Sequence, residues 1–205
     1  MSLEQAMIRS DAMLAATTLA AAACEDVHPG QWTEVLHSGH YVLIRPIRKQ
    51  DMALEQRFIE RLSPQSRRFR FLGAMQSPSS ALLKQLVDID PVRDVALVAL
   101  TTDETEEREI GVARLSADAD GRNCEFAVAV SDEWQQRGLG TLLMQRLVDN
   151  ARARGLRSMS AISAVSNVLM RDLAKHRGFL CGPDPNNATQ VLYSLDLNTL
   201  GIAAV

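Results

Sequence analysis

The chain lacks an excess of positive charge and has few cysteines, and each shortage excludes a class of protein. Its formal net charge is −3 over 205 residues, and it contains neither a block of lysine and arginine nor a basic stripe interleaved with aromatic residues. The electrostatic signature of a nucleic-acid-binding protein is therefore missing. The three cysteines, Cys24, Cys124 and Cys181, are far apart and lack metal-ligand spacing, which predicts reduced thiols, a cytoplasmic location and no bound metal. We expect the partner to be a small molecule or another protein.

Long apolar runs are also absent. No run approaches the ~20 strongly apolar residues needed to cross a bilayer, so we expect no contact with a membrane. Residues 13–24 are dominated by alanine, and Glu4 and Asp11 precede them, whereas a secretion signal begins with a positive segment. Because alanine has the highest helix propensity, we expect an extra N-terminal helix that packs on the domain or on a second subunit of a homo-oligomer.

The length of the chain suits one folded domain with an N-terminal extension. Residues 25–40 are mostly polar, and we interpret them as a linker in which His37 and His40 have no metal-binding partners. We expect residues 1–38 to form the alanine-rich helix and the linker, and residues 39–205 to form the domain.

The most informative feature is the stretch 133–141, which stands between a strand pattern and a helix pattern. Before it, residues 123–130 alternate and include β-branched side chains, and after it apolar residues recur at helical spacing up to Gly155. Gly138 and Gly140 allow main-chain N–H groups to converge on a ligand, and the helix that begins there adds its positive end. The threonine that ends the stretch adds a hydroxyl. The arrangement predicts a loop that binds a diphosphate.

Three other patterns place glycines between a strand and a helix, and two of them are excluded here. A Rossmann fingerprint needs a third glycine where this chain has Leu143, so it does not apply. A Walker phosphate loop needs a Gly-Lys-Ser/Thr sequence that does not follow here. An ordinary turn between a strand and a helix remains as the structural alternative.

Further strand and helix patterns surround this loop. Strands are predicted over residues 41–47, 95–100, 110–115, 123–130, 159–164 and 190–195, and helices over residues 51–62, 77–90, 139–155 and 167–176. The first helix is expected to end at Ser63-Pro64. From residue 41 the order is strand, two helices, three strands, helix, strand, helix, strand.

The spacing Gln135-x-x-Gly138-x-Gly140, followed by two leucines, resembles the acetyl-CoA pyrophosphate loop of the GNAT N-acetyltransferase superfamily. Residues 41–182 resemble more closely the acetyltransferase domain of bacterial Pat-type protein lysine acetyltransferases. The segments that carry this resemblance are residues 44–47, 62–71, 96–99, 111–115, 125–128 and 167–179. The resemblance implies an α/β (α+β) GNAT fold, with a mixed central sheet splayed around an acyl-CoA cleft, and acetyl-CoA as the cosubstrate.

The same resemblance implies an acyltransferase that moves an acetyl group directly to a primary amine, with a protein lysine as the acceptor. Two alternatives remain, because a fold does not determine a function. One is an acetyltransferase for a small-molecule amine, such as a polyamine, an amino acid or an antibiotic. The other is a non-catalytic module that senses acyl-CoA.

The resemblance also implies which residues contact acetyl-CoA. The loop residues implied to lie at the diphosphate are Gln135, Gln136, Arg137, Gly138, Leu139, Gly140 and Thr141. Val128 and Val130 match strand positions whose main-chain groups bind the pantetheine arm and polarise the thioester carbonyl. Asn167 matches a position that contacts the same arm, with the N-cap of a helix as an equal alternative. Many relatives place a tyrosine, the general acid, where this chain has Ala174.

Acetyl transfer to an amine needs a base. A lysine ammonium has a reference pKa of about 10.4, so deprotonation at pH 7 costs about 4.6 kcal/mol. Strand alternation places Glu125 beside the small residues Ala127 and Ala129, which leave room for a ligand. The resemblance places the general base of Pat-type enzymes at the same glutamate, so Glu125 is the predicted catalytic residue. A cross-strand salt bridge or a solvated side chain is the alternative.

Two further groups have less certain roles. A departing thiolate has a reference pKa near 8.5 and can leave without a dedicated acid, and His176 and Tyr193 are the other candidate donors. The arginines Arg67, Arg68 and Arg70 indicate a helix end at the rim of the active site, where they contact cofactor phosphates or an acidic target. A solvated helix end paired with nearby aspartates is the alternative.

Overall fold

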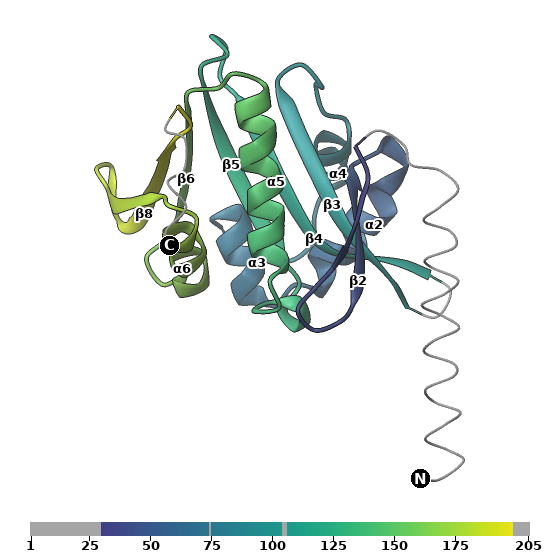
Figure 1. The fold of residues 1–205 in the computed structure, drawn as a ribbon. Helices are drawn as coiled ribbons and strands as arrows, with labels where there is room; N and C mark the ends of the chain where they lie inside the picture. Colours follow the sequence, from purple (N-terminus) through teal and green to yellow (C-terminus); the bar gives the residue numbers. More distant parts are fainter. Residues whose placement is uncertain (1–29, 74, 104–105, 199–205) are drawn as a thin grey trace, which may run out of the picture.

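The computed structural model describes residues 30–73, 75–103 and 106–198. In these residues, eight strands form one mixed sheet with the order β1-β2-β3-β4-β5-β6-β8-β7 (Figure 1), and β5 and β6 are the only neighbours that run parallel. The elements are β1 (Trp32–Val35), β2 (Tyr41–Pro46), the 3-10 helix η1 (Lys49–Asp51), α2 (Met52–Arg61), α3 (Pro64–Phe71), α4 (Ser80–Val87), β3 (Asp94–Asp103), β4 (Glu106–Ala117), β5 (Asn123–Val130), the 3-10 helix η2 (Asp132–Trp134), α5 (Leu139–Ala153), β6 (Ser158–Ala164), α6 (Val168–His176), β7 (Leu180–Asp184) and β8 (Asn187–Asp196). The predicted α/β fold with a mixed central sheet is confirmed. The predicted N-terminal helix lies outside the described residues.

Helices cover both faces of the sheet. In Figure 1, α5 lies across one face, and α2, α3 and α4 lie on the other. Along β3, Leu97 and Ala99 pack in the apolar core beneath α5. Val98 and Leu100 point the other way and pack in the core beneath α2 and α4. A strand buried on both faces explains why the apolar run in this part of the sequence is nearly continuous. In the described part of the chain, no helix is long and apolar enough to cross a membrane.

Three observed elements differ from the expectation. Residues 32–35, expected in the linker, form the edge strand β1 antiparallel to β2, so the linker interpretation of these residues is wrong. A four-residue strand has too short a pattern to be recognised in sequence. The first helix ends before Ser63-Pro64 as predicted, but Pro64 also begins the unpredicted helix α3, because Ser63 caps that helix and proline is favourable in a first helical turn. The short strand β7, which pairs with β8, was also not expected.

Candidate active site

Strands β5 and β6 part from one another and open the sheet. They pair only where Asn123–Glu125 lie beside Ser158–Ser160. Beyond these pairs β5 continues along β4 to Val130, whereas β6 continues along β8. The central sheet is therefore splayed between β5 and β6, as the GNAT resemblance implied.

The main chain of β5 faces this opening. The N–H of Ser131 donates to the carbonyl of Ile110 on β4 at 2.9 Å, so Ser131 faces β4. Because consecutive residues of a strand direct their N–H and C=O groups to opposite sides, Val130 and Val128 direct theirs to the open side. The carbonyl of Val130 accepts a hydrogen bond from Nε2 of Gln135 at 3.1 Å. Within the described residues Val128 has no β6 partner, so its main-chain groups can bind a ligand.

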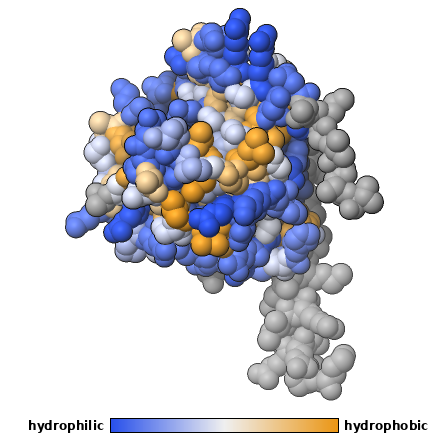
Figure 2. Space-filling view, turned by 90° about the vertical axis from the view of Figure 1, so that its left-hand side faces the viewer, coloured by the Kyte–Doolittle hydropathy of each residue, from blue (hydrophilic) through white to orange (hydrophobic). Residues whose placement is uncertain are grey.

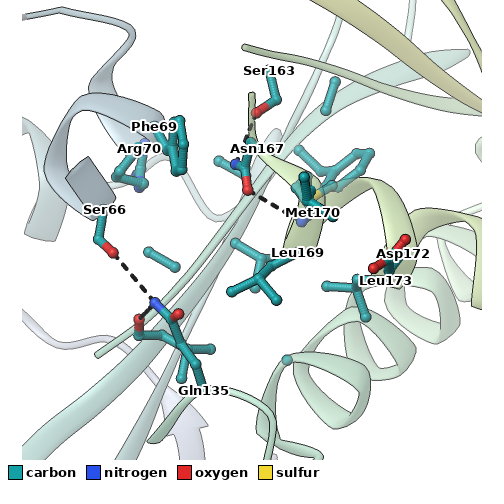
Figure 3. A pocket seen from close by; sticks show the side chains of 18 of the residues that line it. Ser66, Phe69, Arg70, Gln135, Ser163, Asn167, Leu169, Met170, Asp172 and Leu173 are labelled. Atoms are coloured by element: carbon teal, nitrogen blue, oxygen red, sulfur yellow. Dashed lines mark hydrogen bonds between the residues drawn. The ribbon is translucent and has the colours of Figure 1, made fainter. Parts of the chain in front are cut away.

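A cavity of about 1000 Å³ occupies the opening, with lining residues from β5, the following loop, α3, β6 and α6 (Figure 3). Nine of the eleven predicted site residues line it, namely Glu125, Val128, Val130, Gln135, Gln136, Gly138, Gly140, Thr141 and Asn167. The remaining two have side chains outside the cavity. Leu139 is fully buried in the core, and the guanidinium of Arg137 lies 5.3 Å from the ring centre of Trp134. The buried Leu139 can therefore serve a ligand in the cavity only through its main chain.

The loop between β5 and α5 has the geometry of an anion site. Gln136 and Gly138 have positive φ angles of 58° and 90°, which turn the chain sharply into α5. The first N–H groups of a helix have no carbonyl partner within the helix and carry its positive end. At the start of α5 these groups belong to residues 139–141, and Gly140 and Thr141 line the cavity. A diphosphate fits this donor set, since main-chain N–H groups at a helix N-terminus bind phosphate oxygens.

Hydrogen bonds tie α3 to this loop. Asp132 accepts hydrogen bonds from the N–H of Ser63 at 2.9 Å and from the hydroxyls of Ser63 and Ser66 at 2.8 and 2.7 Å. Nε2 of Gln135 also donates to the Ser66 hydroxyl at 3.3 Å (Figure 3). Burial alone raises the pKa of Asp132, but these hydrogen bonds outweigh it and hold the pKa of this carboxyl below its ordinary value. The sequence analysis did not identify Ser66 and Asp132 as residues of the site. The available signal was Ser63-Pro64, which is typical of the start of a helix.

Glu125 is an exposed residue of β5 that lines the cavity. Ala127 and Ala129 line it as well, and α3 contacts the same strand. Among the described residues Glu125 takes part in no ion pair, so the salt-bridge alternative finds no support. The small side chains of this wall leave space beside the Glu125 carboxylate, so an incoming amine can reach it as a base.

The α6 side of the cavity holds Asn167. Its Oδ1 accepts from the N–H of Met170 at 3.2 Å, and its Nδ2 donates to the hydroxyl of Ser163 at 2.9 Å, so Asn167 caps α6 as well as lining the cavity (Figure 3). Ala174, at the usual tyrosine position, is fully buried. Of the two other candidate acids, His176 lines the cavity, whereas Tyr193 is fully buried in the core.

The wall formed by β6 and α6 is apolar. Ile162, Val168 and Leu169 line the cavity with exposed fractions of 42%, 54% and 43%. Figure 2 faces the side of the molecule on which β6, β8 and α6 lie in Figure 1, and it shows apolar side chains gathered in a band between hydrophilic surfaces. Exposed apolar side chains around a cavity mark a surface that contacts a ligand or another protein.

Comparison with known proteins agrees with this geometry. The sequence model of the acetyltransferase (GNAT) family matches residues 68–179. The chain is 43% identical to Acetyltransferase PA5475 of Pseudomonas aeruginosa over 188 residues, which cover 92% of this chain and 100% of that protein.

Two solved structures show the same fold. The structure is similar to that of the GNAT domain of S. lividans PAT, with a TM-score of 0.73, 25% identity, and coverage of 81% of this chain and 96% of that one. It is also similar to yncA, a putative acetyltransferase from Salmonella typhimurium solved with its cofactor acetyl-CoA, with a TM-score of 0.60, 19% identity, and coverage of 78% and 96%. The chain belongs to the acetyltransferase (GNAT) family and is an acetyl-CoA-dependent acetyltransferase.

Proposed function

We propose that this enzyme transfers the acetyl group of acetyl-CoA directly to the ε-amine of a protein lysine, with Glu125 as the general base. The observation that carries the proposal is the divergence of β5 from β6. It places a carboxylate, unpaired strand main chain and the anion-binding loop along one cavity. The resemblance of residues 41–182 to Pat-type enzymes and the similarity to the GNAT domain of S. lividans PAT support a lysine acceptor.

In the proposed reaction Glu125 takes a proton from the lysine ammonium, directly or through water. The free amine then attacks the thioester carbonyl, and a main-chain N–H of β5 at Val128 stabilises the oxyanion that forms. To complete the amide, the nitrogen releases its second proton to solvent and the carbon–sulfur bond breaks, so that the sulfur leaves as a thiolate. Its reference pKa of about 8.5 allows it to leave without an acid, and His176 is the cavity residue that can protonate it.

The remaining parts of the cofactor have matching surfaces in the cavity. The main chain of residues 136–141 would hold the diphosphate at the start of α5. Val130 and Asn167 would border the pantetheine arm, Val130 on β5 and Asn167 across the opening. Free thiols at Cys124 and Cys181 support the proposed cytoplasmic location.

The test is an incubation of the enzyme with acetyl-CoA and host lysate, followed by mass spectrometry for acetyl-lysine. We expect new acetyl-lysine sites that are absent when Glu125→Gln enzyme replaces the wild type. Acetylation of polyamines, amino acids or antibiotic amines without any protein lysine would favour the small-molecule alternative. Binding of acetyl-CoA by calorimetry without turnover on any acceptor would favour the sensor alternative.

A further inference from the structure

Arg70 is a cation in the cavity wall that forms no ion pair with the residues that the structure describes. It lies in the last turn of α3, is half-buried, and lines the cavity together with Phe69 (Figure 3). Its guanidinium carbon lies 5.0 Å from the ring centre of Phe71. Among the described residues, no carboxylate forms an ion pair with it.

The acidic side chains buried behind Arg70 are already paired with other arginines. Arg45 donates two hydrogen bonds to Asp51, at 2.6 and 2.9 Å. Arg114 donates to the carboxylate of Glu55 at 3.0 Å. Each of these carboxylates is thus paired with another arginine, and Glu55 acts on Arg70 only through its charge, which raises the pKa of Arg70.

Glu109 is a further acidic residue of this region, and its surroundings favour its neutral form. It is buried, and neither of its carboxyl oxygens has a hydrogen-bond donor among the described residues. Burial, followed by the negative charge of Glu55, raises the pKa of Glu109 well above its ordinary value. Asp51 and Glu55 are thus held in ion pairs with Arg45 and Arg114, and the raised pKa of Glu109 favours its uncharged form, so among the described residues none of these three carboxyl groups forms an ion pair with Arg70.

Arg70 remains charged at neutral pH. Burial, followed by the charge of Arg114, lowers the pKa of Arg70 to about 10. A partly desolvated cation has lost part of its favourable hydration, and pairing with an anion compensates for that free-energy cost. An arginine meets a carboxylate with two parallel hydrogen bonds, which makes a carboxylate its best partner.

The position of Arg70 favours an acceptor over acetyl-CoA as the source of this carboxylate. Ser66, one helical turn earlier in α3, is the residue that bonds to Gln135 of the phosphate loop. Arg70 lies four residues further along α3, which is about 6 Å along the helix axis. The charge of Arg114 acts on Arg70, and Arg114 pairs with Ala127 on β5, two residues from Glu125, which lines the same cavity as Arg70.

We propose that Arg70 selects acceptors that carry a carboxylate close to the reacting amine, and that in a protein this carboxylate is an aspartate or glutamate beside the target lysine. Glu125 would receive the ammonium and Arg70 the carboxylate, so the two side chains match an acceptor with both charges. The inference rests on the proposed function for its acceptor lysine. A purely structural Arg70 would only complement the C-terminal end of the α3 dipole and pack on Phe71.

The experiment compares three sets of synthetic peptides, each with a single free lysine, in which the lysine is flanked by glutamate, by glutamine or by arginine. We expect the wild type to favour the glutamate peptide over the glutamine peptide by about tenfold in kcat/KM, as for a hydrogen bond to a charged group. Arg70→Gln should abolish the preference, and Arg70→Glu should shift it to the arginine-flanked peptide. Arg68→Gln, an exposed arginine of the same helix outside the cavity lining, is the matched control and should keep the wild-type preference.

Calorimetry and thermal unfolding of each variant separate this role from a structural one. Unchanged acetyl-CoA affinity and melting temperature with an altered peptide preference support the inference. Equal rates of the wild type on glutamate and glutamine peptides overturn it and leave lysine acetylation intact. An Arg70→Gln variant that loses stability and slows equally on all peptides also overturns the inference and leaves lysine acetylation intact.

A second pair of acceptors distinguishes failure of the proposed function from failure of the inference about Arg70. Nα-acetyl-lysine and its C-terminal amide differ only in a carboxylate. If no peptide is acetylated but the acid is preferred to the amide in an Arg70-dependent manner, the carboxylate site stands and the protein acceptor is wrong. If wild type and Arg70→Gln treat the acid and the amide alike as well, the carboxylate site is wrong.

Discussion

Gly138 lies against His37, since a Cβ atom added to Gly138 would stand 3.2 Å from Cδ2 of the imidazole. His37 belongs to the turn between β1 and β2, and His40 of the same turn meets the ring of Trp134 edge-on at 5.2 Å between ring centres. The interpretation of both histidines as linker residues is therefore wrong. The β1–β2 hairpin supports the loop that is predicted to bind the diphosphate.

Gly138→Ala should weaken acetyl-CoA binding at least about tenfold, because the substitution strains a residue at φ 90° and presses on His37. Backbone strain alone costs about 1–2 kcal/mol of stability. Gly155 has φ 74° with nothing within 4 Å of an added Cβ, so Gly155→Ala is the matched control for strain without a loop contact. Calorimetry should show normal affinity for the control. Normal affinity in Gly138→Ala too would remove the loop from the cofactor site.

Glu125→Gln should lower turnover by about 10²–10⁴-fold, the contribution of a positioned base, without changing acetyl-CoA affinity or melting temperature. The deficit should shrink as pH rises towards 10, because neutral amine then becomes abundant without help from the enzyme. Rate measurements from pH 6.5 to 10 test this. Asp172, an exposed α6 residue, is another carboxylate in the cavity lining, and Asp172→Asn is the control. A fully active Glu125→Gln enzyme with an inactive Asp172→Asn enzyme would reassign the base.

Glu109→Gln should make the protein more stable at alkaline pH. Because burial and Glu55 raise the pKa of Glu109, its folded form holds a proton that the unfolded chain releases near pH 4.3 (roughly the reference value). The contribution of this proton to the free energy of unfolding is fully present below that pH and is lost as the pH rises through the folded pKa of Glu109. Urea unfolding from pH 5 to 9 should show a decline in the wild type that the variant lacks. The exposed Glu106 on the same strand supplies the control Glu106→Gln, which should keep the decline.

Asp132→Asn should destabilise the protein near neutral pH and have no effect in strong acid. The pKa of Asp132 is lowered in the folded protein, so its charged form stabilises the fold at pH values above the ordinary pKa of about 3.9. This stabilisation is lost as the pH falls through the folded pKa. Urea unfolding between pH 2.5 and 7 should show the wild type and the variant converging at the acid end. Combined Ser63→Ala and Ser66→Ala substitutions remove the same hydrogen bonds and should reproduce the loss. A gap that persists unchanged to pH 2.5 would contradict the assignment.

A chain that starts at residue 30 should fold and bind acetyl-CoA like the full chain, since no predicted site residue precedes β1. A chain that starts at residue 40 lacks β1 and His37, and we expect it to bind acetyl-CoA more weakly. Calorimetry on both, with their melting temperatures, makes the comparison. Loss of binding in a folded chain that starts at residue 30 would place the preceding segment in the site and move the predicted domain boundary.

The local features of the site were readable in sequence because their residues are contiguous. The glycine loop, the start of α5 and the alternation that places Glu125 beside Ala127 all lie within residues 123–141, where backbone periodicity and glycine conformation decide the structure. The same locality explains the correct prediction of strands β2 to β6. A proline, by contrast, can end one helix or begin the next, so α3 was not recognised.

Contacts between distant segments were decided only by the tertiary structure. Arg114 reaches Glu55 across 59 positions, Gln135 reaches Ser66 across 69, and His37 reaches Gly138 from a turn that looked like a linker. No local period encodes such pairs, because they depend on which helix covers which face of the sheet and on how neighbouring strands are paired. The setting of Arg70 has the same origin: the sequence shows an arginine, but only the packed fold shows that Asp51 and Glu55 are paired with other arginines.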